Sequence, residues 1–270
     1  MDQQLTSADG TLIAFETHGP TDGPTIIEVH GATAFRAIQN AAPGLADAIG
    51  YRAVSFDRRG RGGSGDAPEY AVEREIEDLA ALVAEVPDGA WLLGESSGAV
   101  LALEAARSGI PLRGVVLYEP PFVVNDGRPP VPADYTERLD DHLAAGRRLE
   151  AFKQFSLEGV GMPAEMVEGI EHGPYWPLVG PVAHTLAYDA RVMADTMRGS
   201  ADPLKKYADV GVPALVLVGS ETFPFMHTAA EAIAAVLRDA EIVRLSGADH
   251  QLQPSIVADA VRAFIQRTRA

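Results

Sequence analysis

A serine between two glycines is the clearest candidate for chemistry in this sequence. Ser96 lies in the run Gly94-Glu95-Ser96-Ser97-Gly98. A serine hydroxyl is a weak nucleophile at neutral pH, so it needs a base beside it and an exposed position. Small residues on both sides permit the sharp turn between a strand and a helix that exposes such a serine. The pattern therefore predicts a nucleophile for acyl transfer.

The residues that flank this pentapeptide favour the same interpretation. An apolar run at 90–93 precedes it and is typical of a buried strand, and residues 98–107 have the pattern of an apolar helix. Ser97 is a weaker candidate for the nucleophile, because it lacks the symmetric glycine spacing. We expect its backbone N–H to point at the developing oxyanion instead.

Seven histidines compete for the role of the base, and their positions along the chain distinguish them. His250 lies in a loop between a predicted strand at 241–245 and a closing helix at 255–268. In the chain order nucleophile, acid, histidine, this is the place where the mechanism needs its base. His18 and His30 fall in strands or at strand ends, where structural histidines are the commoner case. We therefore predict His250 as the general base.

A glycine after an early apolar run predicts the second half of an oxyanion hole. Gly31 and Ala32 follow the run at 25–30. A glycine lets the backbone turn tightly, so the Ala32 N–H is expected to face the oxyanion together with the N–H of Ser97. Gly31, Ala32 and Ser97 are the predicted oxyanion hole.

Strands and helices alternate along most of the chain, and these elements must position the candidate residues. The predicted strands span residues 11–18, 25–30, 52–56, 90–93, 113–118, 212–219 and 241–245. Helical patterns occur at 37–49, 69–86, 98–107, 228–237 and 255–268. Such alternation implies right-handed crossovers and a mostly parallel sheet with helices on both faces, an α/β fold.

The alternation is interrupted after residue 121. No Val/Ile-rich run appears between 122 and 207, only a proline-rich entry and helix-forming segments. We predict a core formed by residues 1–121 and 208–270, with a helical cap inserted at 122–207.

Composition and charge limit the classes of protein and of binding partner that the sequence allows. The 270 residues are 47 % hydrophobic and 22 % charged, as in ordinary globular proteins, and they include no cysteine for a disulfide or a thiolate nucleophile. The net charge of −16 would repel nucleic acid and anionic membranes. Neither a signal peptide nor a membrane-spanning run is apparent. We expect a cytoplasmic protein without nucleic-acid or membrane partners, and its oligomeric state is open.

The chain resembles the α/β-hydrolase superfamily over nearly its whole length. The matching segments are His30-Gly31, the run Asp-Arg-Arg-Gly-Arg-Gly-Gly-Ser-Gly at 57–65, the pentapeptide at 94–98 and Gly247-Ala248-Asp249-His250. The resemblance implies a hydrolase with Ser96 as nucleophile and His250 as base, without a metal or an organic cofactor. It also implies that the arginine-rich run at 57–65 is structural.

The acid of the triad departs from the family's usual pattern. That acid is normally an aspartate three residues beyond the glycine that ends the strand after the cap, and counting from Gly219 leads to Thr222. Glu221 and Glu119 could substitute. Glu119 is similar in position to the acid of haloalkane dehalogenases and zearalenone-hydrolysing lactonases, and the lactonases share the Ser-Ser-Gly-Ala sequence that begins at Ser96. We prefer Glu119 and keep both as candidates.

The predicted activity is hydrolysis of a carboxylic ester or lactone of a fairly apolar small molecule. Aromatic and methionine side chains of the cap favour an apolar pocket, and we expect Trp176, His184 and Tyr188 to contact the substrate. The same scaffold hosts C–C bond hydrolases and cofactor-free perhydrolases. A non-catalytic ligand-binding protein of this fold is a further alternative, which Thr222 in the usual acid position supports.

Overall fold

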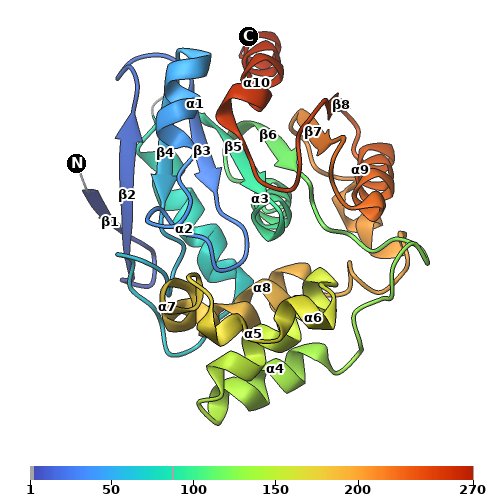
Figure 1. The fold of residues 1–270 in the computed structure, drawn as a ribbon. Coiled ribbons are helices and arrows are strands. Elements are labelled where there is room, and N and C mark those ends of the chain that lie inside the picture. The colour runs from blue at the N-terminus through green and yellow to red at the C-terminus, as the bar shows by residue number, and fades with distance from the viewer. Residues whose placement is uncertain (1–2, 87, 270) are drawn as a thin grey trace.

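One eight-stranded sheet forms the centre of the computed structural model, which describes residues 3–86 and 88–269 (Figure 1). Its strands are β1 (Gln3–Thr6), β2 (Leu12–His18), β3 (Thr25–Val29), β4 (Arg52–Phe56), β5 (Ala90–Glu95), β6 (Leu112–Tyr118), β7 (Ala214–Gly219) and β8 (Ala240–Leu245). The spatial order is β1-β2-β4-β3-β5-β6-β7-β8. The β1–β2 and β2–β4 pairs are antiparallel, and all pairs from β4 to β8 in this order are parallel. The predicted α/β fold class is confirmed.

Helices cover both faces of the sheet. They are α1 (Ala42–Ile49), α2 (Val72–Ala84), α3 (Ser97–Arg107), α9 (Pro224–Val236) and α10 (Pro254–Thr268). Successive side chains of β5 belong to different buried clusters on the two faces of the sheet. Leu92 is in the cluster that includes α2, α3 and α9, whereas Trp91 and Leu93 are in the cluster that includes α1 and α10. A strand buried on both faces has no polar side, which explains its continuous apolar run.

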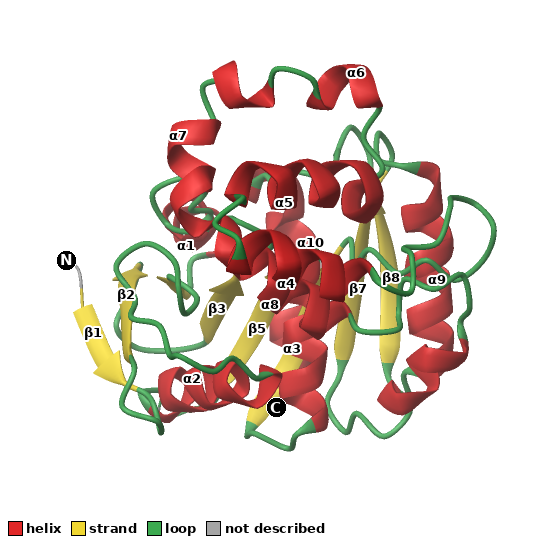
Figure 2. Ribbon diagram, turned by 90° about the horizontal axis from the view of Figure 1, so that it is seen from below, coloured by secondary structure: helices red, strands yellow, loops and turns green. Residues whose placement is uncertain are grey.

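The segment 122–207 contains helices and no strand. Its elements are α4 (Tyr135–Ala144), α5 (Arg148–Gln154), a π-helical turn (Phe155–Val160), α6 (Ala164–Val167), a 3₁₀ turn (Ile170–His172), α7 (Trp176–Val179), a 3₁₀ turn (Gly180–Thr185), α8 (Leu186–Met193) and a 3₁₀ turn (Asp202–Tyr207). We call residues 122–207 the helical insertion. Figures 1 and 2 show it across one end of the sheet, the end to which the arrow of β3 points. It therefore covers the carboxyl ends of the parallel strands.

Local structure differs from the sequence analysis at two places near the N-terminus. The sequence pattern did not indicate β1, a short and largely exposed edge strand that pairs with β2. The helix expected at 37–49 begins only at Ala42, because the buried carboxylate of Glu28 accepts hydrogen bonds from the Ala41 and Ala42 N–H groups at 3.0 and 3.3 Å. No helix in the described part of the chain is long and apolar enough to cross a membrane.

Candidate active site

Ser96 lies at the turn between β5 and α3, as the pentapeptide predicts. Its φ and ψ angles are 55° and −123°, an uncommon conformation for a residue with a side chain. The Ser96 N–H donates a hydrogen bond to the Tyr118 carbonyl at 2.9 Å, which ties the turn to the end of β6. The predicted strand-to-helix setting of Ser96 is therefore confirmed.

The two glycines of the pentapeptide are required by close backbone approach. A Cβ atom on Gly94 would lie 2.3 Å from the Gly98 carbonyl oxygen, and one on Gly98 would lie 2.1 Å from the Val29 carbonyl oxygen. Both neighbours are backbone atoms, which cannot move aside as a flexible side chain can. The tight packing of β3, β5 and α3 thus explains the small residues on either side of Ser96.

Replacing Gly98 by alanine is expected to lower the free energy of unfolding by at least about 3 kcal/mol, since the backbone must shift to admit the methyl group. Chemical denaturation of both forms measures this difference. Gly211→Ala is the matched control, because a Cβ there meets nothing within 4 Å. Equal stabilities for the Gly98→Ala and Gly211→Ala variants would contradict the steric explanation.

The imidazole of His250 contacts the carboxylate of Glu119. His250 Nδ1 lies 2.6 Å from Glu119 Oε2, and Glu119 is completely buried at the end of β6. The other oxygen of Glu119 accepts a hydrogen bond from the Gly219 N–H at 2.8 Å. A buried carboxylate held in this way can fix both the tautomer and the orientation of the imidazole.

The structure places Thr222 and Glu221 in different surroundings. The Thr222 hydroxyl donates to Glu119 Oε2 at 2.7 Å, so the residue in the family's usual acid position supports the carboxylate that contacts His250. Glu221 is exposed, and its carboxylate accepts a hydrogen bond from the Ser220 hydroxyl at 3.2 Å. Glu119 and not Glu221 is thus hydrogen-bonded to the histidine.

The loop that carries His250 is fixed by residues beside Ser96 and Glu119. The Tyr118 hydroxyl donates to the Asp249 carbonyl at 2.5 Å. Buried Glu95 accepts from the Leu252 N–H at 3.4 Å and from the Gln39 side chain. Burial raises the pKa of Glu95, although hydrogen bonds from Gln39 and Leu252 oppose this effect. Sequence patterns gave no signal for Tyr118, a buried strand residue.

The predicted oxyanion donors lie beside Ser96. A Cβ on Gly31 would be 3.1 Å from Ser96 Cβ, so this stretch of backbone packs directly on the turn. Ala32 and Ser97 both line the same pocket as Ser96 and His250. The Ser97 N–H is in the first turn of α3, where a helix leaves its N–H groups without an intrahelical acceptor.

The pocket between these residues and the helical insertion has mostly apolar walls. Its side walls are Pro121, Val131, Tyr135, Phe155, Val160, Leu186, Met193, Met197, Phe223, Phe225 and Met226. Arg128, Arg198 and Asp189 are the charged residues of the lining. A small, largely apolar molecule fits such a pocket beside Ser96.

The three predicted substrate contacts do not line this pocket. His184 and Tyr188 both bond to Asp66, at 3.2 and 2.9 Å, on the border between the helical insertion and the core. Trp176 packs against Phe152, with ring centroids 5.8 Å apart. The pattern of aromatic residues could not show which side of a short helix faces the nucleophile.

His30, the other histidine near Ser96, is completely buried beneath the turn. Its Nε2 atom lies 3.0 Å from the Ser55 hydroxyl. Burial, together with the positive charge of Arg61, lowers the pKa of His30 to about 3, so the ring is neutral. It is a structural histidine, as its place at a strand end predicts. No cluster of metal-ligating side chains occurs in the parts of the chain that the structure describes.

Comparison with known proteins agrees with this fold. The model of the alpha/beta hydrolase family matches residues 29–266, and the chain belongs to this family. A 2-(acetamidomethylene)succinate hydrolase of Mesorhizobium japonicum is 30 % identical over 90 % of this chain and 88 % of its own length. A non-heme chloroperoxidase of Streptomyces lividans is 25 % identical over 97 % of this chain and 99 % of its own.

A solved structure is more similar still. An alpha/beta hydrolase from Sphaerobacter thermophilus has 42 % identity and a TM-score of 0.86, and the match covers 97 % of this chain and all of that one. Together the family and these relatives define the protein as a hydrolase.

Proposed function

We propose that the protein is a serine hydrolase that cleaves a carboxylic ester or lactone through an acyl-enzyme on Ser96. The observation that supports this most directly is the 2.6 Å contact between His250 Nδ1 and the buried Glu119, with His250 and Ser96 on one pocket. Nucleophile, base and orienting acid are the three groups that acyl transfer by serine needs.

In the proposed reaction, Ser96 Oγ attacks the carbonyl carbon while His250 Nε2 takes the hydroxyl proton. Glu119 accepts a hydrogen bond from His250 Nδ1 and stabilises the imidazolium that forms. The N–H groups of Ala32 and Ser97 donate to the oxyanion. His250 then returns the proton to the departing alcohol oxygen. Water, deprotonated by the same histidine, attacks the acyl carbonyl, and the ester bond to Ser96 breaks as His250 returns the proton to Ser96 Oγ and the acid is released.

The apolar walls of the pocket support a fairly apolar acyl or alcohol group as the first choice of substrate. The side chains that contribute them come mainly from the helical insertion, which we propose acts as a cap over Ser96. The methionines Met193, Met197 and Met226 are flexible and suit a pocket that accepts several apolar shapes. The exact bounds of the cap, and a cytoplasmic location, stay predictions.

A substrate that carries a carboxylate is a second candidate. Arg128 donates to the carbonyls of residues 158–160 and Arg198 to those of Val131 and Ala133. Neither guanidinium forms an ion pair with a carboxylate of a described residue, so both bring positive charge to the pocket wall. The relative that hydrolyses 2-(acetamidomethylene)succinate is consistent with an anionic substrate.

Two other activities use the same groups. C–C bond hydrolysis and perhydrolysis both fit a serine, histidine and carboxylate beside an oxyanion hole, and the chloroperoxidase relative gives the second some support. A non-catalytic ligand-binding role loses its main argument, because Thr222 is hydrogen-bonded to the carboxylate that replaces the usual acid.

A fluorophosphonate probe tests the proposal, because it reacts preferentially with an activated serine. We expect one adduct per folded chain, located on Ser96 by peptide mass spectrometry. Labelling of a different residue, or none, would contradict the serine mechanism.

A turnover screen then identifies the bond and the substrate class. It compares esters, lactones, amides and vinylogous diketones, and it includes a butyrate ester beside a succinate monoester of the same alcohol. Higher kcat/KM for the butyrate ester is expected from the apolar walls, whereas preference for the succinate monoester would favour the anionic candidate.

A further inference from the structure

A carboxylate of the helical insertion contacts the residue that follows the nucleophile. Asp189 lies on α8, and its Oδ1 accepts a hydrogen bond from the Ser97 hydroxyl at 2.8 Å. The Ser97 backbone N–H is one of the two proposed oxyanion donors. The insertion is therefore joined by a buried hydrogen bond to the oxyanion hole itself.

The same carboxylate holds two buried arginines of the run at 57–65. Asp189 Oδ1 accepts from Arg58 at 2.8 Å, and Asp189 Oδ2 accepts from Arg61 at 2.7 Å. Both arginines are about 1 % exposed and Asp189 is 3 % exposed. Glu75 accepts two further hydrogen bonds from Arg58, so the four formal charges balance.

The two arginines in turn hold the loop that carries the other oxyanion donor. Arg58 donates to the His30 carbonyl at 3.1 Å. Arg61 donates to the carbonyls of Gly31 and Ala34, at 2.5 and 3.2 Å. These acceptors lie on both sides of Ala32, so the direction of the Ala32 N–H depends on the two guanidinium groups.

Electrostatics keeps Asp189 ionised in this position. Burial by itself would raise the pKa of its carboxyl, but the positive charges of Arg61 and Arg58 and the Ser97 hydroxyl hold that pKa below its usual value. An ionised carboxylate accepts from all three donors with charge assistance, whereas a neutral acid would place its own O–H donor among them.

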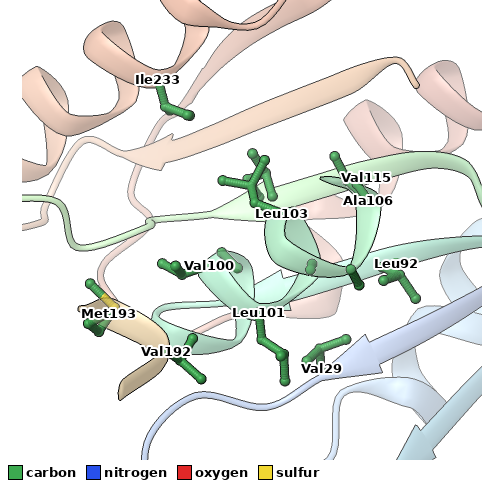
Figure 3. Close-up of a cluster of buried hydrophobic side chains, with 14 of the residues drawn as sticks. Val29, Leu92, Val100, Leu101, Leu103, Ala106, Val115, Val192, Met193 and Ile233 are labelled. Atoms are coloured by element: carbon green, nitrogen blue, oxygen red, sulfur yellow. The ribbon is translucent and has the colours of Figure 1, made fainter. Parts of the chain in front are cut away.

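Apolar packing fixes α8 against the helix that begins at Ser97. Val192 and Met193 of α8 belong to the same buried cluster as Val100 and Leu101 of α3, and Figure 3 shows these side chains together. Asp189 is thus carried on a helix whose distance from the nucleophile turn is set by close packing.

We propose that Asp189 is a positioning residue that sets the oxyanion hole of this enzyme from the helical insertion. It acts on one donor through the Ser97 hydroxyl and on the other through Arg58 and Arg61. The inference rests on the proposed function, because an oxyanion hole has a role only if Ser96 attacks a carbonyl group.

The decisive variant is Asp189→Asn, which keeps the shape of the side chain and removes its charge. We expect kcat for 4-nitrophenyl butyrate to fall about 10- to 100-fold, since both oxyanion donors lose their orientation, while KM changes by less than about threefold. Binding of an alkyl trifluoromethyl ketone, whose adduct with Ser96 carries an oxyanion, should weaken by the same factor as kcat/KM.

Asp140→Asn is the matched control. Asp140 forms an ion pair with Arg191, also on α8, at 2.8 Å, and it forms no hydrogen bond or ion pair with residues 30–34 or with Ser97. This variant removes the same charge from an anchor of the same helix. Because the pair is half-exposed, we expect kcat within about twofold of the wild type.

The possible results distinguish a failure of the proposed function from a failure of the inference about Asp189. A wild-type enzyme without a Ser96 adduct would overturn the proposed function and this inference with it. A reactive wild type and a folded Asp189→Asn variant with unchanged kcat would overturn the inference alone. So would a raised KM with unchanged kcat, which would mean that Asp189 contacts the substrate directly.

A second variant decides the matter if Asp189→Asn does not fold. Ser97→Ala removes only the hydroxyl that bonds to Asp189 and keeps the backbone N–H. We expect a smaller loss of kcat, about 3- to 10-fold, and circular dichroism confirms the fold of each variant. Unchanged kcat in Ser97→Ala would then refute the positioning role.

Discussion

Replacing Ser96 by alanine is expected to lower kcat for ester hydrolysis by about 10⁴- to 10⁶-fold. Alanine removes the only atom that can form the acyl-enzyme, and it leaves the pocket and the oxyanion donors in place. The remaining activity would come from binding and oxyanion stabilisation of a carbonyl that water attacks. Steady-state kinetics with 4-nitrophenyl butyrate measures the loss, and the fluorophosphonate adduct should disappear with it.

Thermal unfolding gives the control for this variant. Alanine tolerates the φ of 55° no better and no worse than serine, so the melting temperature should be close to that of the wild type. A stable Ser96→Ala protein that keeps more than about a tenth of the turnover would contradict a nucleophilic role for Ser96.

Replacing Glu119 by glutamine is expected to lower kcat by about 10⁴-fold. The neutral amide cannot stabilise the imidazolium of His250 that forms when Ser96 loses its proton. Glutamine also keeps only one acceptor oxygen, so its NH₂ group would face either the Gly219 N–H or the two donors His250 and Thr222 without accepting a hydrogen bond. Part of the change should therefore appear as lower stability, which denaturation measures separately.

Glu221→Gln is the matched control for the acid. Glu221 is exposed and bonded to Ser220, so the same change of charge there should alter kcat by less than about threefold. A large loss in Glu221→Gln with little effect in Glu119→Gln would reverse the assignment of the acid. Slight effects in both would mean that the imidazole is oriented without a carboxylate.

Local sequence patterns predicted the elements that build the site. Each of these patterns is formed by residues that are close together in the sequence. They are the glycines around Ser96, the alternation of strands and helices, and the lack of strand patterns between 122 and 207. Such patterns predict secondary structure because the spacing of apolar side chains and the conformational freedom of the backbone are local properties. The edge strand β1 escaped detection, since a short exposed strand has little apolar pattern to show.

The choice between Glu119 and Glu221 needed the tertiary structure. Glu119 and His250 are 131 positions apart, and only the order of β6, β7 and β8 in the sheet brings their side chains together. The sequence narrowed the acid to two carboxylates at strand ends. Which of them is buried and points at the imidazole depends on the whole sheet.

The supporting contacts were likewise decided by the fold. Nothing in the sequence near Thr222 or Asp189 indicates that one supports Glu119 and the other bonds to Ser97. The lining of the pocket depends on which side of each short helix in the insertion faces Ser96. Trp176, His184 and Tyr188 are therefore not part of the lining.

Sequence alone therefore determined the nucleophile's setting, the fold class and the chain order of the candidate residues. Tertiary structure decided which carboxylate contacts His250, which side chains face Ser96 and how Asp189 of the insertion is connected to Ser97 and, through Arg58 and Arg61, to residues 30–34. The physical reason is distance along the chain: backbone turns and periodicity are encoded by neighbours, whereas side-chain pairing is encoded by packing among segments far apart in the sequence.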